Sequence, residues 1–147
     1  MIAVLMLLTA CQHSRHIKEG DEHLQQGRHS AALESYRNAQ AHRPDSQKIA
    51  DRIALAEERL VEETLVQVRG RLEAESYLQA IEIAARGWEQ FPEERAIRKL
   101  VGEVFDRITD KAEADLERDY FSSALLLYEA LETNFFDYGE SLRPRIL

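Results

Sequence analysis

The stretch GDEHLQQGRHSAALESYRNAQAHRP, residues 20–44, decides the fold class. Small residues, one tyrosine and one proline recur in it at helical spacing. Gly27 supplies the positive φ that ends one helix and turns the chain. Pro44 ends the next helix, because its ring cannot continue a helix. The stretch therefore predicts two helices joined by a tight turn. The positions that define it are Gly20, Gly27, Ala32, Tyr36, Ala39 and Pro44.

Gly20 indicates a close contact between these two helices. Glycine in a helix interior costs about 1 kcal/mol relative to alanine, so its presence suggests that a neighbouring helix passes too close for a side chain. Ala32 and Ala39 lie seven residues apart on one face of the second helix, where small side chains permit that approach. Tyr36, between them, is expected to fill the gap toward the next pair of helices.

Two weaker copies of the pattern follow. Ala80 lies 48 residues after Ala32, and Ala124 lies 44 residues after Ala80. The second copy ends in Pro92, but Glu75 stands where the turn glycine would be; the third copy keeps a tyrosine, Tyr128. A long helix is expected before each of these copies. The helix before the second copy should run from about 46 to 73, with apolar positions at Ile49, Ile53, Ala56, Leu60, Val68 and Leu72. The helix before the third copy has its apolar positions at Ile97, Val101, Val104, Ile108 and Ala112.

The spacing of the first copy resembles the tetratricopeptide repeat. The resemblance implies an all-α solenoid of about three antiparallel helical hairpins, here with unusually long first helices because the copies exceed the usual period of about 34 residues. It also implies noncatalytic protein binding, with an extended peptide or helix of a partner in the concave groove. The first helices line that groove in the family. Candidate contact residues there are Gln25, Gln26, Gln67, Arg69, Arg107 and Lys111.

The N-terminal residues resemble a bacterial lipoprotein signal. The sole cysteine, Cys11, follows an apolar run over residues 2–8 that is shorter than the roughly 20 residues needed to span a bilayer. The resemblance implies a signal peptide over 1–10, lipid on Cys11, a tether over 11–16 and a helical domain over 17–147. Gln12 is not the aspartate that retains such proteins at the inner membrane, which implies the outer membrane, facing the periplasm. The alternative is a buried thiol in an apolar N-terminus.

Composition excludes several classes of function. A net charge of −8 argues against nucleic-acid binding, because phosphates require clustered Lys and Arg. A single cysteine excludes an intramolecular disulfide, and no phosphate-binding glycine loop, nucleophile elbow or HExxH signature occurs. We therefore expect no enzyme activity and no cofactor. An adaptor in an envelope assembly, secretion or pilus complex is the expected role; the rival roles are a self-associating structural lipoprotein and a periplasmic protein that binds a small molecule or metal.

Three features keep two interpretations each. His16, Glu19 and His23 share one helix face and suit zinc or nickel, but solvated side chains are favoured over a metal site. Trp88 is favoured as a core residue over a binding hot spot. The aromatic end at 135–138 either folds back as a cap or contacts a partner.

Overall fold

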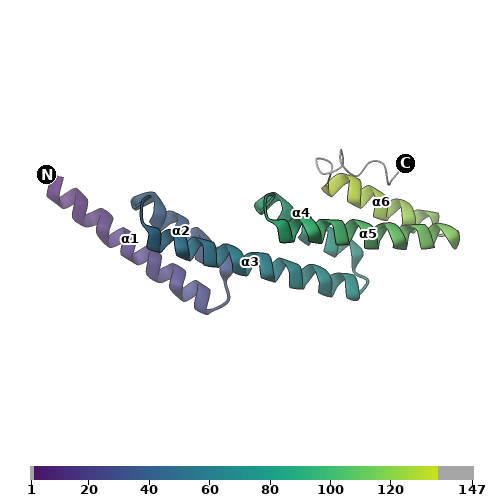
Figure 1. Cartoon of the computed structure of the whole chain (residues 1–147), viewed down its shortest axis with the longest axis horizontal. Coiled ribbons are helices and arrows are strands. Elements are labelled where there is room, and N and C mark those ends of the chain that lie inside the picture. The colour runs from purple at the N-terminus through teal and green to yellow at the C-terminus, as the bar shows by residue number, and fades with distance from the viewer. Residues whose placement is uncertain (1, 136–147) are drawn as a thin grey trace. The chain divides into compact units, whose positions relative to one another are not determined.

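The computed structural model describes the backbone of residues 2–135 and the side chains of residues 13–135 (Figure 1). These residues form helices and no strand, which confirms the all-α prediction. The long helix expected over 46–73 is also confirmed. The six helices are α1 (Ile2–Gln25), α2 (His29–His42), α3 (Gln47–Glu73), α4 (Tyr77–Gln90), α5 (Arg95–Glu117) and α6 (Phe121–Asn134).

The chain divides into two compact units within α3. The first unit runs from Met1 to Glu62 and the second from Glu63 to Leu147. In the first unit α1 contacts α2; in the second, α4 contacts both α5 and α6, and α5 contacts α6 (Figure 1). Because α3 crosses the boundary, it supplies core side chains to both units. Ile49, Ala56 and Leu60 are buried in the first, and Val68 and Leu72 in the second.

Three turns that share the same pair of backbone hydrogen bonds join α1 to α2, α3 to α4, and α5 to α6. Their central residues all have positive φ: Gly27 at 69°, Glu75 at 54° and Asp119 at 62°. Glycine adopts this conformation readily, whereas glutamate and aspartate adopt it against a steric penalty. We call these three the turn residues. Because they are 48 and 44 residues apart, the turns have the same spacing as Ala32, Ala80 and Ala124.

The hydrogen bonds at each turn are those of a Schellman motif. The residue after the turn residue donates its N–H to the carbonyl five positions earlier, from Arg28 to His23 at 2.9 Å, from Ser76 to Arg71 at 2.8 Å, and from Tyr120 to Asp115 at 2.8 Å. The turn residue itself donates to the carbonyl three positions earlier in all three cases. Otherwise unpaired carbonyls at the helix ends are thereby satisfied. The same local structure therefore forms on three different sequences.

The close approach predicted at Gly20 is confirmed. A Cβ at this position would lie 2.4 Å from Cε1 of Tyr36, far inside carbon–carbon contact distance. Tyr36 therefore packs on α1 within its own pair of helices, in addition to reaching toward α3. Ala32 and Ala39 are fully buried beside it. Pro44 follows the end of α2 by two residues, as expected for a residue that stops a helix.

The helical structure extends further toward the N-terminus than the expected start at Ile17. The helix α1 is continuous through residues 12–16, and His13 is buried, with Nδ1 3.3 Å from the carbonyl oxygen of Ala39 on α2. A hydrogen bond to that carbonyl allows a polar ring to be buried there.

Within residues 2–135 no helix is long and apolar enough to cross a membrane. The side chain of Cys11 lies outside the described residues.

Among the described side chains, the second unit has the more extensive apolar core. The predicted stripe of α5 is completely buried at Ile97, Val101, Val104, Ile108 and Ala112. On α4, Ala80 and Ala84 are buried, and Gly87 lies so close to α3 that a Cβ would be 2.8 Å from Cγ2 of Thr64. Phe135, just after α6, is buried with its ring centroid 5.2 Å from that of Phe105. Of the aromatic end, Phe135 thus belongs to the core, while residues 136–138 lie outside the described residues.

Candidate protein-binding site

A polar junction ties the first three helices together. The Tyr36 hydroxyl of α2 donates to Oδ1 of Asp21 on α1 at 2.8 Å, and Arg52 of α3 donates to both oxygens of that carboxylate at 2.7 and 3.0 Å. The Arg52 guanidinium, assisted by the tyrosine, lowers the pKa of Asp21. Burial and the neighbouring carboxylate raise the pKa of Tyr36 to about 12. The junction therefore holds the phenol protonated and the carboxylate ionised.

A second junction links α3 to α5 with the charges reversed. Arg69 of α3 forms an ion pair with Glu103 of α5, its Nη2 lying 3.3 Å from Oε2. Lys99, one turn earlier on α5, approaches the same carboxylate at 3.8 Å. All three side chains are partly exposed, so the pairing contributes orientation more than stability. Arg69 is also one of the residues expected to contact a partner, and the ion pair shows that it is engaged within the chain.

A buried carboxylate fixes the start of α6 on the end of α5. Asp115 is almost fully buried; its Oδ2 accepts a hydrogen bond from the Ser123 hydroxyl at 2.6 Å, and its Oδ1 pairs with Lys111. The lysine ammonium and the serine hydroxyl lower the pKa of Asp115. Lys111, predicted to contact a partner, therefore neutralises a buried charge at the α5–α6 turn.

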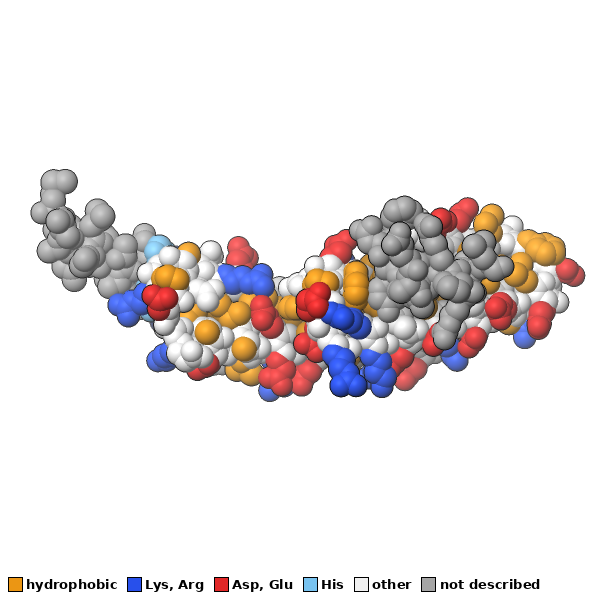
Figure 2. Space-filling model, turned by 45° about the horizontal axis from the view of Figure 1, so that its top comes forward, with side chains coloured by type: hydrophobic (Ala, Val, Ile, Leu, Met, Phe, Trp, Pro, Cys, Tyr) orange, Lys and Arg blue, Asp and Glu red, His pale blue; other side chains and the backbone are white. Residues whose placement is uncertain are grey.

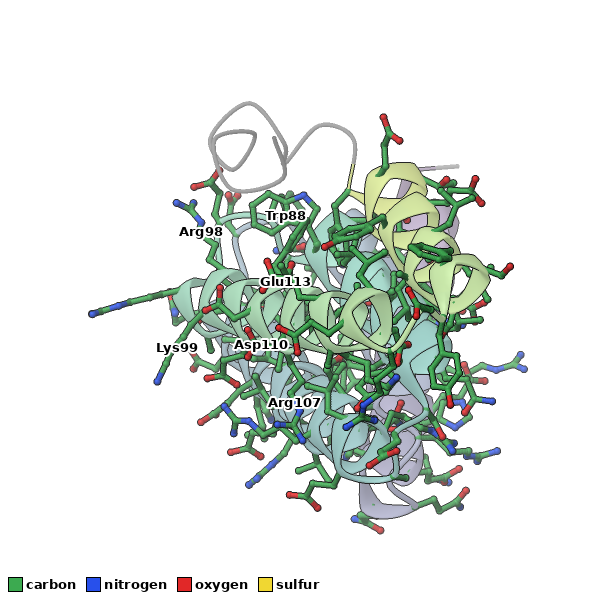
Figure 3. All side chains as sticks on the ribbon, turned by 90° about the vertical axis from the view of Figure 1, so that its right-hand side faces the viewer. Trp88, Arg98, Lys99, Arg107, Asp110 and Glu113 are labelled. Atoms are coloured by element: carbon green, nitrogen blue, oxygen red, sulfur yellow. The ribbon has the colours of Figure 1, made fainter. Side chains whose placement is uncertain are left out.

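The remaining predicted contact residues are divided between the two units. Gln25 and Gln26 lie at the end of α1, both exposed, and Gln26 accepts a hydrogen bond from Arg28. Gln67 on α3 donates to Glu63 at 2.9 Å. Arg107 is exposed on α5, and Figure 3 shows it on a different side of that helix from Glu113. Gln25 and Gln26 belong to the first unit and the other four to the second.

His16 and Glu19, two of the three candidate metal ligands on α1, contact other side chains. His16 stacks on His42 of α2, with parallel rings whose centroids are 6.0 Å apart, and its Nδ1 is 3.3 Å from Oε2 of Glu19. Glu19 also forms an ion pair with Arg15. The Nδ1 atom of His23 is buried without a hydrogen-bond partner. No group of three or more potential ligands gathers within residues 13–135.

The structure exposes an apolar surface that the sequence analysis missed. Figure 2 shows hydrophobic side chains at the right-hand end, where α5 passes into α6. The run Leu125-Leu126-Leu127 was an available signal, because consecutive helical residues are about 100° apart and cannot all face one core. Leu127 is buried, whereas Leu125 and Leu126 are 58% and 51% exposed. The exposed large residues of this surface are Leu116, Tyr120, Phe121, Leu125 and Leu126.

The pockets near this surface are open and shallow. One of about 410 Å³ lies over the α5–α6 turn between Asp119 and Ser123. Another of about 370 Å³ lies between the α3–α4 turn and Leu127 of α6. Shallow apolar hollows of this kind suit the side chains of a macromolecular partner more than an enclosed small ligand. No family model, curated protein or solved structure matches this chain.

Proposed function

We propose that this chain is a noncatalytic protein-binding scaffold, built as a divergent tetratricopeptide-like solenoid of three antiparallel hairpins. The observation that supports this most directly is the recurrence of one Schellman turn, with positive φ at all three turn residues. Recurrence at 48 and 44 residues is expected of a repeat array with lengthened first helices. In such arrays each unit buries its apolar face against its neighbours and leaves a long surface for a partner.

The surroundings of the perturbed side chains support binding more than catalysis. The pKa of Asp21 is lowered by Arg52 and Tyr36 of neighbouring helices, and that of Asp115 by Lys111 one turn earlier on α5 and by Ser123 of α6. Catalytic acids and bases instead lie in clefts that tune their pKa values toward the working pH. Each of these two carboxylates holds helices together, and each is accounted for by that role.

We further propose that lipid on Cys11 anchors the scaffold to the outer membrane of a bacterial envelope, facing the periplasm. The support is the position of the sole cysteine after a short apolar run. The test compares membrane fractionation of the wild type with Cys11→Ser, which should be released into the soluble fraction. Gln12→Asp is the matched control: it keeps the cysteine and should move the protein to the inner membrane. Retention of Cys11→Ser in membranes would contradict the anchor.

The partner-binding role is tested by photo-crosslinking in intact cells. A photoreactive amino acid at Gln25 or Arg107, both exposed, should capture one discrete partner protein. The same group at Glu89, which is exposed on α4 and is not among the predicted contact residues, serves as the matched control and should capture much less. Equal, diffuse capture at all three positions would argue against a specific scaffold.

A further inference from the structure

One face of α6 is apolar and uncovered among the described residues. Phe121, Leu125 and Tyr128 are spaced four and three residues apart and therefore lie along one side of the helix. Phe121 is 62% exposed, Leu125 is 58% exposed, and Tyr128 is half-buried. A row of large apolar side chains at this degree of exposure indicates an interaction surface. Together with Glu113 of α5, these residues are here called the end face.

In the two earlier helix pairs, a following helix covers the residue that corresponds to Leu125. Six residues after each turn residue stand Leu33, Ile81 and Leu125. Leu33 is 2% exposed and Ile81 is 0% exposed, against 58% for Leu125. A following helix lies beside each of the first two: α3 lies beside α2, where Arg37 pairs with Glu57 at 3.0 Å, and α5 contacts α4. The position on α6 is the third of the series and has no such helix among the described residues.

Charged side chains at corresponding positions of the three helix pairs follow the same pattern. Six residues before each turn residue stand Asp21, Arg69 and Glu113. Asp21 pairs with Arg52 at 2.7 Å and Arg69 pairs with Glu103 at 3.3 Å, so in both cases the next long helix supplies the opposite charge. No cation within residues 13–135 forms an ion pair with Glu113, which Figure 3 labels on α5.

Tyr128 and Glu113 repeat the arrangement of Tyr36 and Asp21. Both tyrosines stand nine residues after a turn residue. Burial, followed by the nearby Glu113 carboxylate, raises the pKa of Tyr128, just as burial and Asp21 raise that of Tyr36. Tyr128 and Glu113 therefore provide the phenol and the carboxylate of a similar junction. What this pair lacks, among the described side chains, is a guanidinium in the place that Arg52 occupies beside Asp21.

We propose that the end face binds an amphipathic α-helix of a partner protein that places an arginine against Glu113. Its apolar stripe would cover Phe121, Leu125 and Tyr128 as α3 covers α2. The segment of α3 around Arg52 shows the required pattern, with apolar residues at Ile49, Ile53 and Ala56 on the side that faces the core. The inference depends on the repeated turns and charge pairs, and is independent of the lipid anchor and of the concave groove.

A peptide copied from α3 provides the probe. The sequence SQKIADRIALAEERLVE, residues 46–62, carries the apolar stripe and the arginine, and can be labelled and titrated against the full chain by fluorescence anisotropy. We expect saturable binding that Leu125→Lys and Glu113→Arg each weaken by about tenfold or more. The peptide with Arg52→Glu should bind Glu113→Arg better than it binds the wild type. That reversal separates recognition of charge from general apolar adhesion.

The matched control is Leu126→Lys. Leu126 is 51% exposed, like Leu125, but its counterparts in the earlier pairs are the exposed Glu34 and Glu82. Lysine there should leave peptide binding unchanged, and both exposed-site variants should keep the wild-type circular dichroism spectrum. Equal weakening by the two lysine substitutions would overturn the proposal.

Three further results would also overturn it. Absence of saturable binding up to about 1 mM peptide would remove the helix-binding role. Binding that requires deletion of residues 136–147 would assign the face to the chain's own C-terminal segment. A concentration-dependent dimer in sedimentation that Leu125→Lys dissociates would assign the face to a second copy of the chain.

Discussion

Gly20→Ala should destabilise the protein even though alanine is the better helix former. The gain in helix propensity is about 1 kcal/mol. The added Cβ, however, would lie 2.4 Å from Cε1 and 2.6 Å from Cδ1 of Tyr36, whereas carbon atoms in contact lie about 3.5–4.0 Å apart. The Tyr36 ring is fully buried and its hydroxyl is bonded to Asp21, so it can retreat only by breaking that bond. Overpacking costs about 1–3 kcal/mol, and loss of a hydrogen bond to a charged group costs about 1.5–3 kcal/mol.

When both costs are offset by the gain in propensity, the expected net loss is about 1.5–5 kcal/mol in the free energy of unfolding, or several degrees in Tm. Gly70→Ala on α3 and Gly102→Ala on α5 are matched controls, because a Cβ at either position meets no atom within 4 Å. Both should stabilise the protein by up to about 1 kcal/mol through propensity alone. Urea and thermal unfolding followed by far-ultraviolet circular dichroism give the comparison.

A double-mutant cycle isolates the steric contribution. In a Tyr36→Leu background the ring is absent, so Gly20→Ala should become neutral or stabilising there. The coupling free energy should be about 2 kcal/mol, the range found for residues in direct contact. If Gly20→Ala alone were as stable as Gly70→Ala, the close approach would not determine the residue at position 20, and the reasoning would be refuted.

Three further outcomes are expected. Glu75→Gly and Asp119→Gly should each raise the free energy of unfolding by about 0.5–1 kcal/mol and Gly27→Ala should lower it by about 1 kcal/mol, because glycine alone tolerates positive φ without steric penalty; chemical denaturation measures all three. Asp21→Asn should lose stability by a constant amount at neutral pH, and the difference from wild type should close as pH falls below 3.8, because the folded pKa of Asp21 lies under that unfolded value. The wild type should lose stability as pH rises from 10 to about 12, because folding favours the protonated phenol of Tyr36, and Tyr36→Phe should not show this loss. Titrations of Tm against pH that coincide for the two proteins would contradict this.

Sequence reasoning was most accurate where backbone constraints dominate. Gly27 turns the chain, Pro44 follows the end of α2, and Gly20 lies against a neighbouring ring. Helical periodicity likewise identified the buried stripe of α5 from Ile97 to Ala112. In these cases one residue type is required for a local steric reason, or one spacing repeats over several turns, so the signal is present in the sequence itself.

The remaining features depend on tertiary contacts. Nothing in the composition around Glu75 or Asp119 requires positive φ; the flanking helices impose it, and only the register with Gly27 identifies the positions. His13 is polar, so its burial follows from the nearby carbonyl of Ala39. The exposure of Leu125 depends on which helix follows α6, and a hydrophobic residue is by itself a signal for burial.

The burial of His13 sets a short reach between the proposed lipid and the folded body. Only residue 12 separates Cys11 from His13, and two residues span at most about 7 Å even when fully extended. That length is comparable to the roughly 5–7 Å depth of one headgroup layer. The first unit would thus rest at the lipid surface near Arg15 and Lys18, with little freedom to tumble. A partner that binds the first unit would therefore have to reach it at the lipid surface.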